Sequence, residues 1–271
     1  MTDTSGTSVD AAGSAPRGIS PYATGGGGVT LERRVAVLYL AQMLVGSTSN
    51  ELDGRRVERV AFQQAPARDV DDLVVMSRRD DGTDALELDI AVRRAPTFTV
   101  SDKHTEKLIG DLLAALDDSP EEGLTRRLAI CVAGPQNAAQ QVSNLATMAR
   151  SQSSPSEFFE LVRTPSRFRQ TLRSRLEHFA DLVTANLVAV GVDTSAEATE
   201  AATWQLLRHL TILMPRLEAP DETDWSALLS QLEPWAREQT VVAATALRDR
   251  LESLAAAYSP AAANVDLVVR S

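Results

Sequence analysis

The sequence of 271 residues is poor in the residue types on which several kinds of site depend. It contains one cysteine, Cys131, and three histidines, which excludes an internal disulfide framework and a zinc cluster of Cys and His ligands. It has no run of about 18 apolar residues that would cross a bilayer, and its amino terminus lacks a basic segment followed by an apolar one. We therefore expect a cytoplasmic protein with no membrane partner.

Lysine is nearly absent, since only Lys103 and Lys107 are lysines among 27 basic residues. The 37 acidic residues give a net charge of -10, which argues against a protein that coats nucleic acid, because phosphate binding requires clustered positive charge. Several arginines nevertheless gather along the segment that is predicted to form strands. They are Arg55, Arg56, Arg59, Arg68, Arg78, Arg79, Arg93 and Arg94. The sequence therefore predicts a locally basic strand region that could meet phosphate.

Three parts of the chain differ in composition. Over residues 1–28, Ser, Thr, Gly, Ala and Pro dominate, and too few apolar groups are present to offset the entropy of ordering. The remainder has the apolar and charged content of a globular protein and is long enough for two domains of ordinary size. We expect a disordered tail over 1–28, an α/β domain over 29–152 and a helical domain over 153–271.

Hydrophobic periodicity predicts the elements of the first half. A helix runs from Thr30, as N-cap, to about Gly46, and three strands follow it. The strands are expected at 56–63, 70–78 and 85–93. The third alternates cleanly: Leu86, Leu88, Ile90 and Val92 share one face, and Glu87, Asp89, Ala91 and Arg93 share the other.

Asp102 follows this strand and reads as the N-cap of a helix whose apolar residues recur at helical spacing. Residues 127–133 are nearly all apolar, which predicts a central strand that is covered on both faces, and a further helix is expected over 137–150. The order is therefore αβββαβ with a final helix. After the Ser/Pro segment the periodicity predicts helices only. They are expected at 166–190, 196–214, 225–233 and 234–258.

Acidic and basic side chains gather on the predicted strands. Asp71 and Asp72 open the second strand, Arg93 ends the polar face of the third, and Glu32 lies on the first helix. Carboxylates around a divalent cation, with a positive charge beside the attacking water, are the groups that metal-assisted hydrolysis requires. The alternative is that the two aspartates merely bound a strand and that the polar face is solvated.

These features resemble the restriction-endonuclease-like PD-(D/E)XK superfamily. The likeness rests on the αβββαβ order, on Gly-x-x-x-Glu from Gly28 to Glu32, on Asp-Asp-Leu-Val-Val at residues 71–75 and on the strand that ends in a basic residue. It covers roughly residues 26–135. The sequence is most similar to variants at the amino termini of bacterial anti-phage defence proteins, in which a helical region follows.

The resemblance implies roles for individual residues. Glu32 matches the helix-one acid that helps to organise the metal, and Asp72 matches the first acidic metal ligand. Ala91-Val92-Arg93 matches the family's Glu/Gln-x-Lys element, but Ala91 offers no oxygen to a cation and an arginine guanidinium stays protonated. Asp89 shares the face but lies about 13 Å along the strand from Arg93. Half of the expected metal site is missing.

Three functions remain open from the sequence. The first is a nuclease-derived, catalytically impaired module of a bacterial defence or signalling protein, whose partners are DNA, other subunits or domains of a defence complex, or a second copy of the chain. The second is an active Mg²⁺-dependent DNA endonuclease that uses Glu32, Asp72, Asp89 and Arg93. The third is a helical interaction module on an α/β scaffold, with an exposed apolar patch over residues 166–258. Residues 264–271 are apolar, and we expect either that the chain is a fragment of a longer protein or that it ends in a strand docked on a partner.

Overall fold

The computed structural model describes residues 26–63, 70, 72–117, 123–165, 169–219, 221–259 and 264–266. Within these ranges the chain forms six strands and eight α-helices, with short 3₁₀ turns at Asn50–Leu52 and Glu233–Trp235. The strands are β1 (Arg56–Phe62), β2 (Leu73–Arg78), β3 (Ala85–Val92), β4 (Leu124–Cys131), β5 (Leu210–Leu213) and β6 (Asn264–Asp266). The helices are α1 (Gly26–Val45), α2 (Lys103–Asp117), α3 (Asn137–Ser151), α4 (Pro155–Arg163), α5 (Gln170–Val190), α6 (Ala196–His209), α7 (Thr223–Leu232) and α8 (Val241–Tyr258).

All six strands belong to one mixed sheet in the order β5-β4-β3-β2-β1-β6. β1, β2 and β3 pair antiparallel, as short connections allow, whereas β3, β4 and β5 run parallel. The parallel step from β3 to β4 is made through α2, and the step from β4 to β5 through α3–α6. The predicted αβββαβ order of the first half is therefore confirmed.

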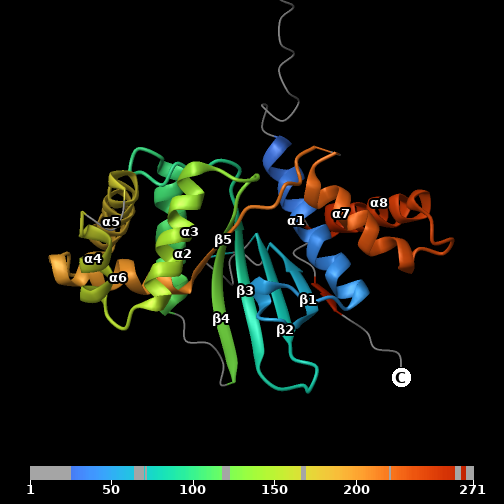
Figure 1. Cartoon of the computed structure of the whole chain (residues 1–271), viewed down its shortest axis with the longest axis horizontal. Helices are drawn as coiled ribbons and strands as arrows, with labels where there is room; N and C mark the ends of the chain where they lie inside the picture. The colour runs from blue at the N-terminus through green and yellow to red at the C-terminus, as the bar shows by residue number, and fades with distance from the viewer. Residues whose placement is uncertain are drawn as a thin grey trace, which may run out of the picture.

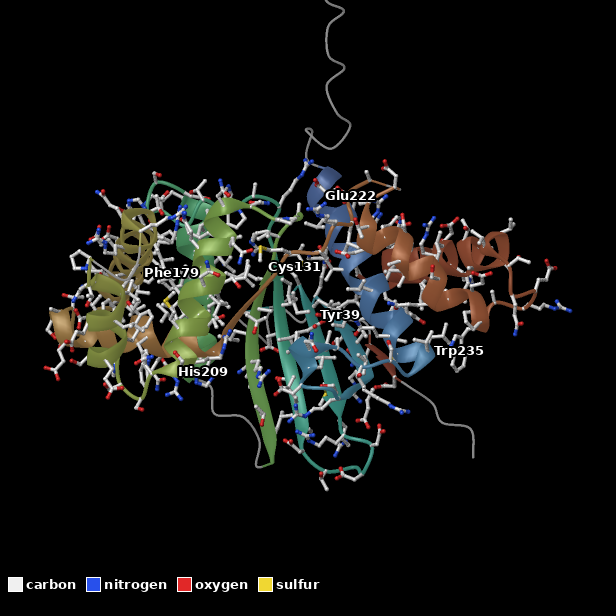
Figure 2. The ribbon with its side chains drawn as sticks, viewed as in Figure 1. Tyr39, Cys131, Phe179, His209, Glu222 and Trp235 are labelled. Atoms are coloured by element: carbon white, nitrogen blue, oxygen red, sulfur yellow. The ribbon has the colours of Figure 1, made fainter. Side chains whose placement is uncertain are left out.

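Helices cover both faces of the sheet (Figure 1). Helices α2–α6 pack on one face and α1, α7 and α8 on the other, so the sheet separates two apolar cores. Figure 2 labels a side chain from each core, Phe179 among α2–α6 and Tyr39 on α1. In β4, Leu128 and Ile130 enter the first core, while Ala129 and Cys131 enter the second. This confirms the prediction of a central strand that is covered on both faces.

The second half of the chain departs from the expected all-helical domain, because β5 and β6 lie in it and extend the sheet at its two edges. Leu206, Leu210 and Leu213 continue one helical spacing, but α6 stops at His209 and the backbone then pairs with β4. β6 pairs with β1 of the same chain, and residues 267–271 lie outside the described residues, so docking on a partner stays a prediction. The all-helical expectation is wrong for these two strands, and the division at residue 152 stays a prediction.

The amino-terminal boundary also differs from the expectation. Helix α1 begins at Gly26, four residues before the predicted N-cap Thr30, and it ends beside Gly46, whose φ of 64° stops a helix. The expected tail over residues 1–28 lies outside the described residues, apart from the first helical turn at 26–28. None of the helices in the described part of the chain combines the length and apolar composition that crossing a bilayer requires.

Arg34 joins α1 to the segment that leads into α7. Its Nη1 donates to the carbonyls of Leu217 and Glu218, the latter at 2.6 Å. Two guanidinium groups lie over the Trp225 ring, that of Arg34 at 4.9 Å and that of Arg248 of α8 at 4.8 Å from its centroid. These contacts fix α7 and α8 on the α1 face of the sheet, where they close the second core.

Asp102 caps α2, as its position in the sequence predicts. Its carboxylate accepts from the backbone N–H groups of Thr105 and Thr97, each at 3.1 Å, and from the Thr105 hydroxyl at 2.6 Å. Burial acts to raise the pKa of Asp102, but these hydrogen bonds outweigh it and bring the pKa from 3.8 to about 2.

We predict that Asp102→Ala lowers the free energy of unfolding by about 1 kcal/mol, because the cap of α2 is lost. Since the folded-state pKa of Asp102 is depressed, its contribution is present above pH 3.8 and disappears as the pH falls toward 2. Urea unfolding of both proteins from about pH 6 down to pH 2 measures this, and the two curves should converge at low pH. A difference that persists unchanged at pH 2 would contradict the assignment.

Candidate functional site

The candidate site lies where β2 begins and β3 ends. Leu73 pairs with Ile90 in the antiparallel register, so Asp72, one residue before β2, comes level with Ala91. Arg93 follows the last residue of β3 and is held to β4 by a hydrogen bond from its backbone N–H to the Cys131 carbonyl at 2.9 Å. The register therefore places the predicted acid and the predicted basic residue at one end of the same strand pair.

The Asp72 carboxylate is bonded by two donors from β3 and its end. Its Oδ2 accepts from the backbone N–H of Val92 at 2.7 Å and from Nη1 of Arg93 at 2.6 Å. The same guanidinium nitrogen donates to the Val92 carbonyl at 2.8 Å, which holds the arginine against the strand. The Asp72 side chain is only 20% exposed, so this charge-assisted pair is shielded from water more than a surface ion pair.

Glu32 reaches the site from α1. Its Oε1 accepts from the Ser259 hydroxyl at 2.9 Å, at the carboxyl end of α8, and from the Gln63 amide at 3.4 Å. Burial raises the pKa of Glu32; the Ser259 hydrogen bond lowers it, the negative charge of Asp72 raises it, and Gln63 and Arg33 lower it. Together these effects raise the pKa of Glu32. Because the charge of Asp72 acts on Glu32, the two acids share one electrostatic environment.

Gln63 connects the two acids through the backbone. It follows β1 with a φ of 40°, in the left-handed region that a residue with a Cβ rarely adopts. Its N–H donates to the Asp72 carbonyl at 3.3 Å, while its side chain faces Glu32. Gln63 and Ser259 are site residues that the sequence analysis missed. No motif marks them, because each reaches Glu32 only through the packing of distant segments.

Asp89 is bound by an arginine of the neighbouring strand β4. Its carboxylate is fully buried and is bound by Arg126 of β4 at 2.7 Å, and Glu87 lies 3.6 Å from the same guanidinium. Arg126 Nη1 also donates to the Ala115 carbonyl of α2. The polar face of β3 is therefore not solvated, since α2 covers it and the buried charges are neutralised by an arginine from the next strand. The assignment of Asp89 to the candidate site stays a prediction.

The arginines of the strand region are mostly neutralised within the chain. Each described member of the predicted cluster forms an ion pair with a carboxylate. The pairs are Arg55–Asp84, Arg56–Asp80, Arg59–Asp266, Arg78–Glu58, Arg79–Asp84, Arg93–Asp72 and Arg94–Glu218. Arg68 lies outside the described residues. The pairing explains how a locally basic sequence fits a protein of net charge -10, and it removes much of the positive charge on which a phosphate contact would depend.

The residues at the site do not fit a Mg²⁺ centre as they stand. Ala91 contributes no oxygen where the resemblance places a second ligand, and Asp72 Oδ2 already has two donors. Glu32 Oε1 has two donors of its own. Among the described residues, no group of three or more His, Cys, Asp or Glu side chains is arranged to hold a metal ion. Asp71, the neighbouring acid, lies outside the described residues.

Comparisons with known proteins give similarity in structure only. No protein-family model and no curated protein matches the chain. A solved Acinetobacter baumannii Cap4 SAVED/CARF-domain-containing receptor with the cyclic trinucleotide 3'3'3'-cAAA is 11% identical over 88% of this chain and 42% of its own, with a TM-score of 0.46. Another structure of that receptor is 12% identical over 88% of this chain and 44% of its own, with a TM-score of 0.47. The Moraxella osloensis Cap4 SAVED/CARF-domain-containing receptor is 13% identical over 88% of this chain and 44% of its own, with a TM-score of 0.40. The chain spans less than half the length of these receptors.

We predict that two substitutions move the pKa of Glu32 in opposite directions. Asp72→Asn should lower it, because a neighbouring negative charge is removed, and Ser259→Ala should raise it, because a hydrogen bond to the carboxylate is lost. Carboxyl ¹³C NMR titration of Glu32 measures both shifts, with Asp80→Asn as a control at an acid that pairs with Arg56. An unchanged pKa in Asp72→Asn would show that the two acids do not share one environment.

Proposed function

We propose that the chain is a nuclease-derived module of a bacterial anti-phage defence or signalling protein, and that it acts by binding or assembly rather than by cleavage. The observation that carries this proposal is the ion pair of 2.6 Å between Arg93 and Asp72. It puts a fixed protein cation against the acid that would otherwise hold a metal. The partners in this proposal are DNA, other domains or subunits of a defence complex, or a second copy of the chain.

The arrangement of the elements supports a restriction-endonuclease-like origin. The resemblance drawn from the sequence rests on the αβββαβ order, and the fold has this order with β3 and β4 parallel and α1 packed on the sheet. Asp72 at the start of β2 and Ala91-Val92-Arg93 at the end of β3 come together through the register of two adjacent strands. Glu32 from α1 completes the set of side chains that the resemblance implies.

Loss of cleavage follows from the chemistry of these residues. Metal-assisted hydrolysis of a phosphodiester needs a cation that polarises the phosphate and activates a water. Ala91 supplies no ligand, and the Arg93 guanidinium is both permanently protonated and already bonded to Asp72. A protonated arginine cannot act as a general base toward water. The active endonuclease that uses Glu32, Asp72, Asp89 and Arg93 is less well supported, because Asp89 is bound by Arg126.

Exposed apolar side chains support assembly as the mode of action. Val188, Val190 and Val192 at the end of α5 are more than half exposed. At the other end of the molecule, Trp235, Val241 and Val242 are exposed at the start of α8, and Figure 2 labels Trp235 at this margin. Both groups fall within the region that the helical interaction hypothesis names. Apolar groups of this kind are typical of surfaces that contact another protein.

We predict no cleavage when the protein is incubated with supercoiled plasmid DNA and Mg²⁺ or Mn²⁺. The wild type, Asp72→Ala and the control Asp80→Ala should leave the plasmid equally intact, as measured by gel electrophoresis over hours. Asp80 is a matched control because it is an exposed acid paired with an arginine, Arg56, on the same strands. Rapid cleavage by the wild type that is abolished in Asp72→Ala and kept in Asp80→Ala would overturn the proposal.

A further inference from the structure

A cavity lined by several charged side chains lies beside β5, at the edge of the sheet opposite β6. Its volume is about 470 Å³, which lies within the range of small-molecule sites. Four basic side chains line it: Arg127 of β4, Arg150 at the end of α3, and Arg208 and His209 at the end of α6. We call it the arginine pocket. Figure 2 labels His209 below α3. The pocket shares no residue with the site at Asp72.

The four basic groups are positioned by different contacts. Arg127 Nη1 donates to Asp53 at 2.9 Å, so its charge is matched. Arg150 Nη1 donates to the Leu210 carbonyl at 2.8 Å, at the junction of α6 and β5. The Arg208 guanidinium lies 4.4 Å from the centroid of the Trp204 ring. Backbone and ring contacts orient Arg150 and Arg208, but they do not neutralise either charge.

The acids of the arginine pocket are already engaged. Asp53 binds Arg127 and also accepts from Arg55 at 3.3 Å. Glu51 accepts from the Tyr39 hydroxyl at 3.4 Å, so one of its oxygens is directed at α1. Across the described ranges, no carboxylate forms an ion pair with Arg150, Arg208 or His209. This sets them apart from the strand arginines, each of which has an acidic partner.

The basic side chains of the arginine pocket act on one another. Burial lowers the pKa of His209, and the charges of Arg208 and Arg127 lower it further. Burial also lowers the pKa of Arg150, and Arg127 again adds to the effect. Positive charges that repel one another in a partly enclosed cavity are relieved by a bound anion. Arginine is the side chain best suited to a phosphate, because its planar fork donates two parallel hydrogen bonds to the oxygens.

We propose that the arginine pocket binds the phosphate groups of a small phosphorylated ligand, with Arg150, Arg208 and His209 as the donors that contact it. The cavity exceeds the size of a single phosphate and leaves room for an organic part next to Asn50 and Thr211. The alternative reason for these residues is structural, since cations in the last turns of α3 and α6 favour the negative ends of the helix dipoles. The ligand-binding explanation predicts that an added anion binds in the pocket, whereas the helix-dipole explanation does not.

The test is calorimetric titration of the full chain with inorganic pyrophosphate at low ionic strength. We expect saturable binding at one site, with Arg150→Gln and Arg208→Gln each weakening the affinity about tenfold or more, as loss of a charged hydrogen bond implies. Arg248→Gln is the matched control, because Arg248 lies over Trp225 at 4.8 Å much as Arg208 lies over Trp204. It should bind pyrophosphate as the wild type does.

Two further readouts keep the test decisive. The ring signals of His209 in NMR spectra should shift during the titration with the same dissociation constant, and Arg208→Lys should retain part of the affinity if it folds normally by circular dichroism. No saturable binding to the wild type, or equal binding by all variants, would overturn the proposal. A loss of binding in Arg93→Gln instead would move the pyrophosphate to the Asp72 site and also reject it.

Discussion

Burial of both faces of the central strands is the constraint on which the rest of this structure depends. β3 and the Leu128–Cys131 half of β4 lie between two layers of helices, so nearly every side chain along them must be apolar. Glu87 and Asp89 are exceptions, and Arg126 of the adjacent strand neutralises them. The polar side chains of the candidate site lie at the ends of these strands. The Asp72–Arg93 pair occupies one such end, and the arginine pocket lies along the β4–β5 edge.

Most of the first half of the fold could be predicted from the sequence, because its signals are local. Alternation in β3, the apolar run of β4 and the capping position of Asp102 each depend on near neighbours. β5 could not be predicted, since Leu210 and Leu213 continue the helical spacing of α6 and only the pairing with β4 makes them a strand. β6 has three residues and is defined by its partner β1. In both cases a long-range contact outweighs the local pattern.

The candidate site could be predicted in part. Glu32, Asp72 and Arg93 carry recognisable chemistry at recognisable places on the elements, and the register brings Asp72 and Arg93 into contact. Asp89 shows the limit of this reasoning, because alternation predicts which residues share a face of a strand but not whether a helix covers that face. Ion pairs between residues that are distant in the chain likewise cannot be predicted from the sequence alone. The arginines near the strands form a cluster in the sequence, yet in the fold they are mostly matched with acids.

The central claim is that the Arg93 guanidinium, rather than a metal ion, neutralises Asp72. Calorimetric titration with Mn²⁺ tests it most directly, using the wild type, Asp72→Ala, Arg93→Ala and the double variant with both substitutions. The account predicts no saturable Mn²⁺ binding to the wild type, only weak binding in Arg93→Ala, where Asp72 is released but Ala91 still supplies no second ligand, and its loss in the double variant. Stoichiometric Mn²⁺ binding by the wild type that disappears in Asp72→Ala would contradict the account.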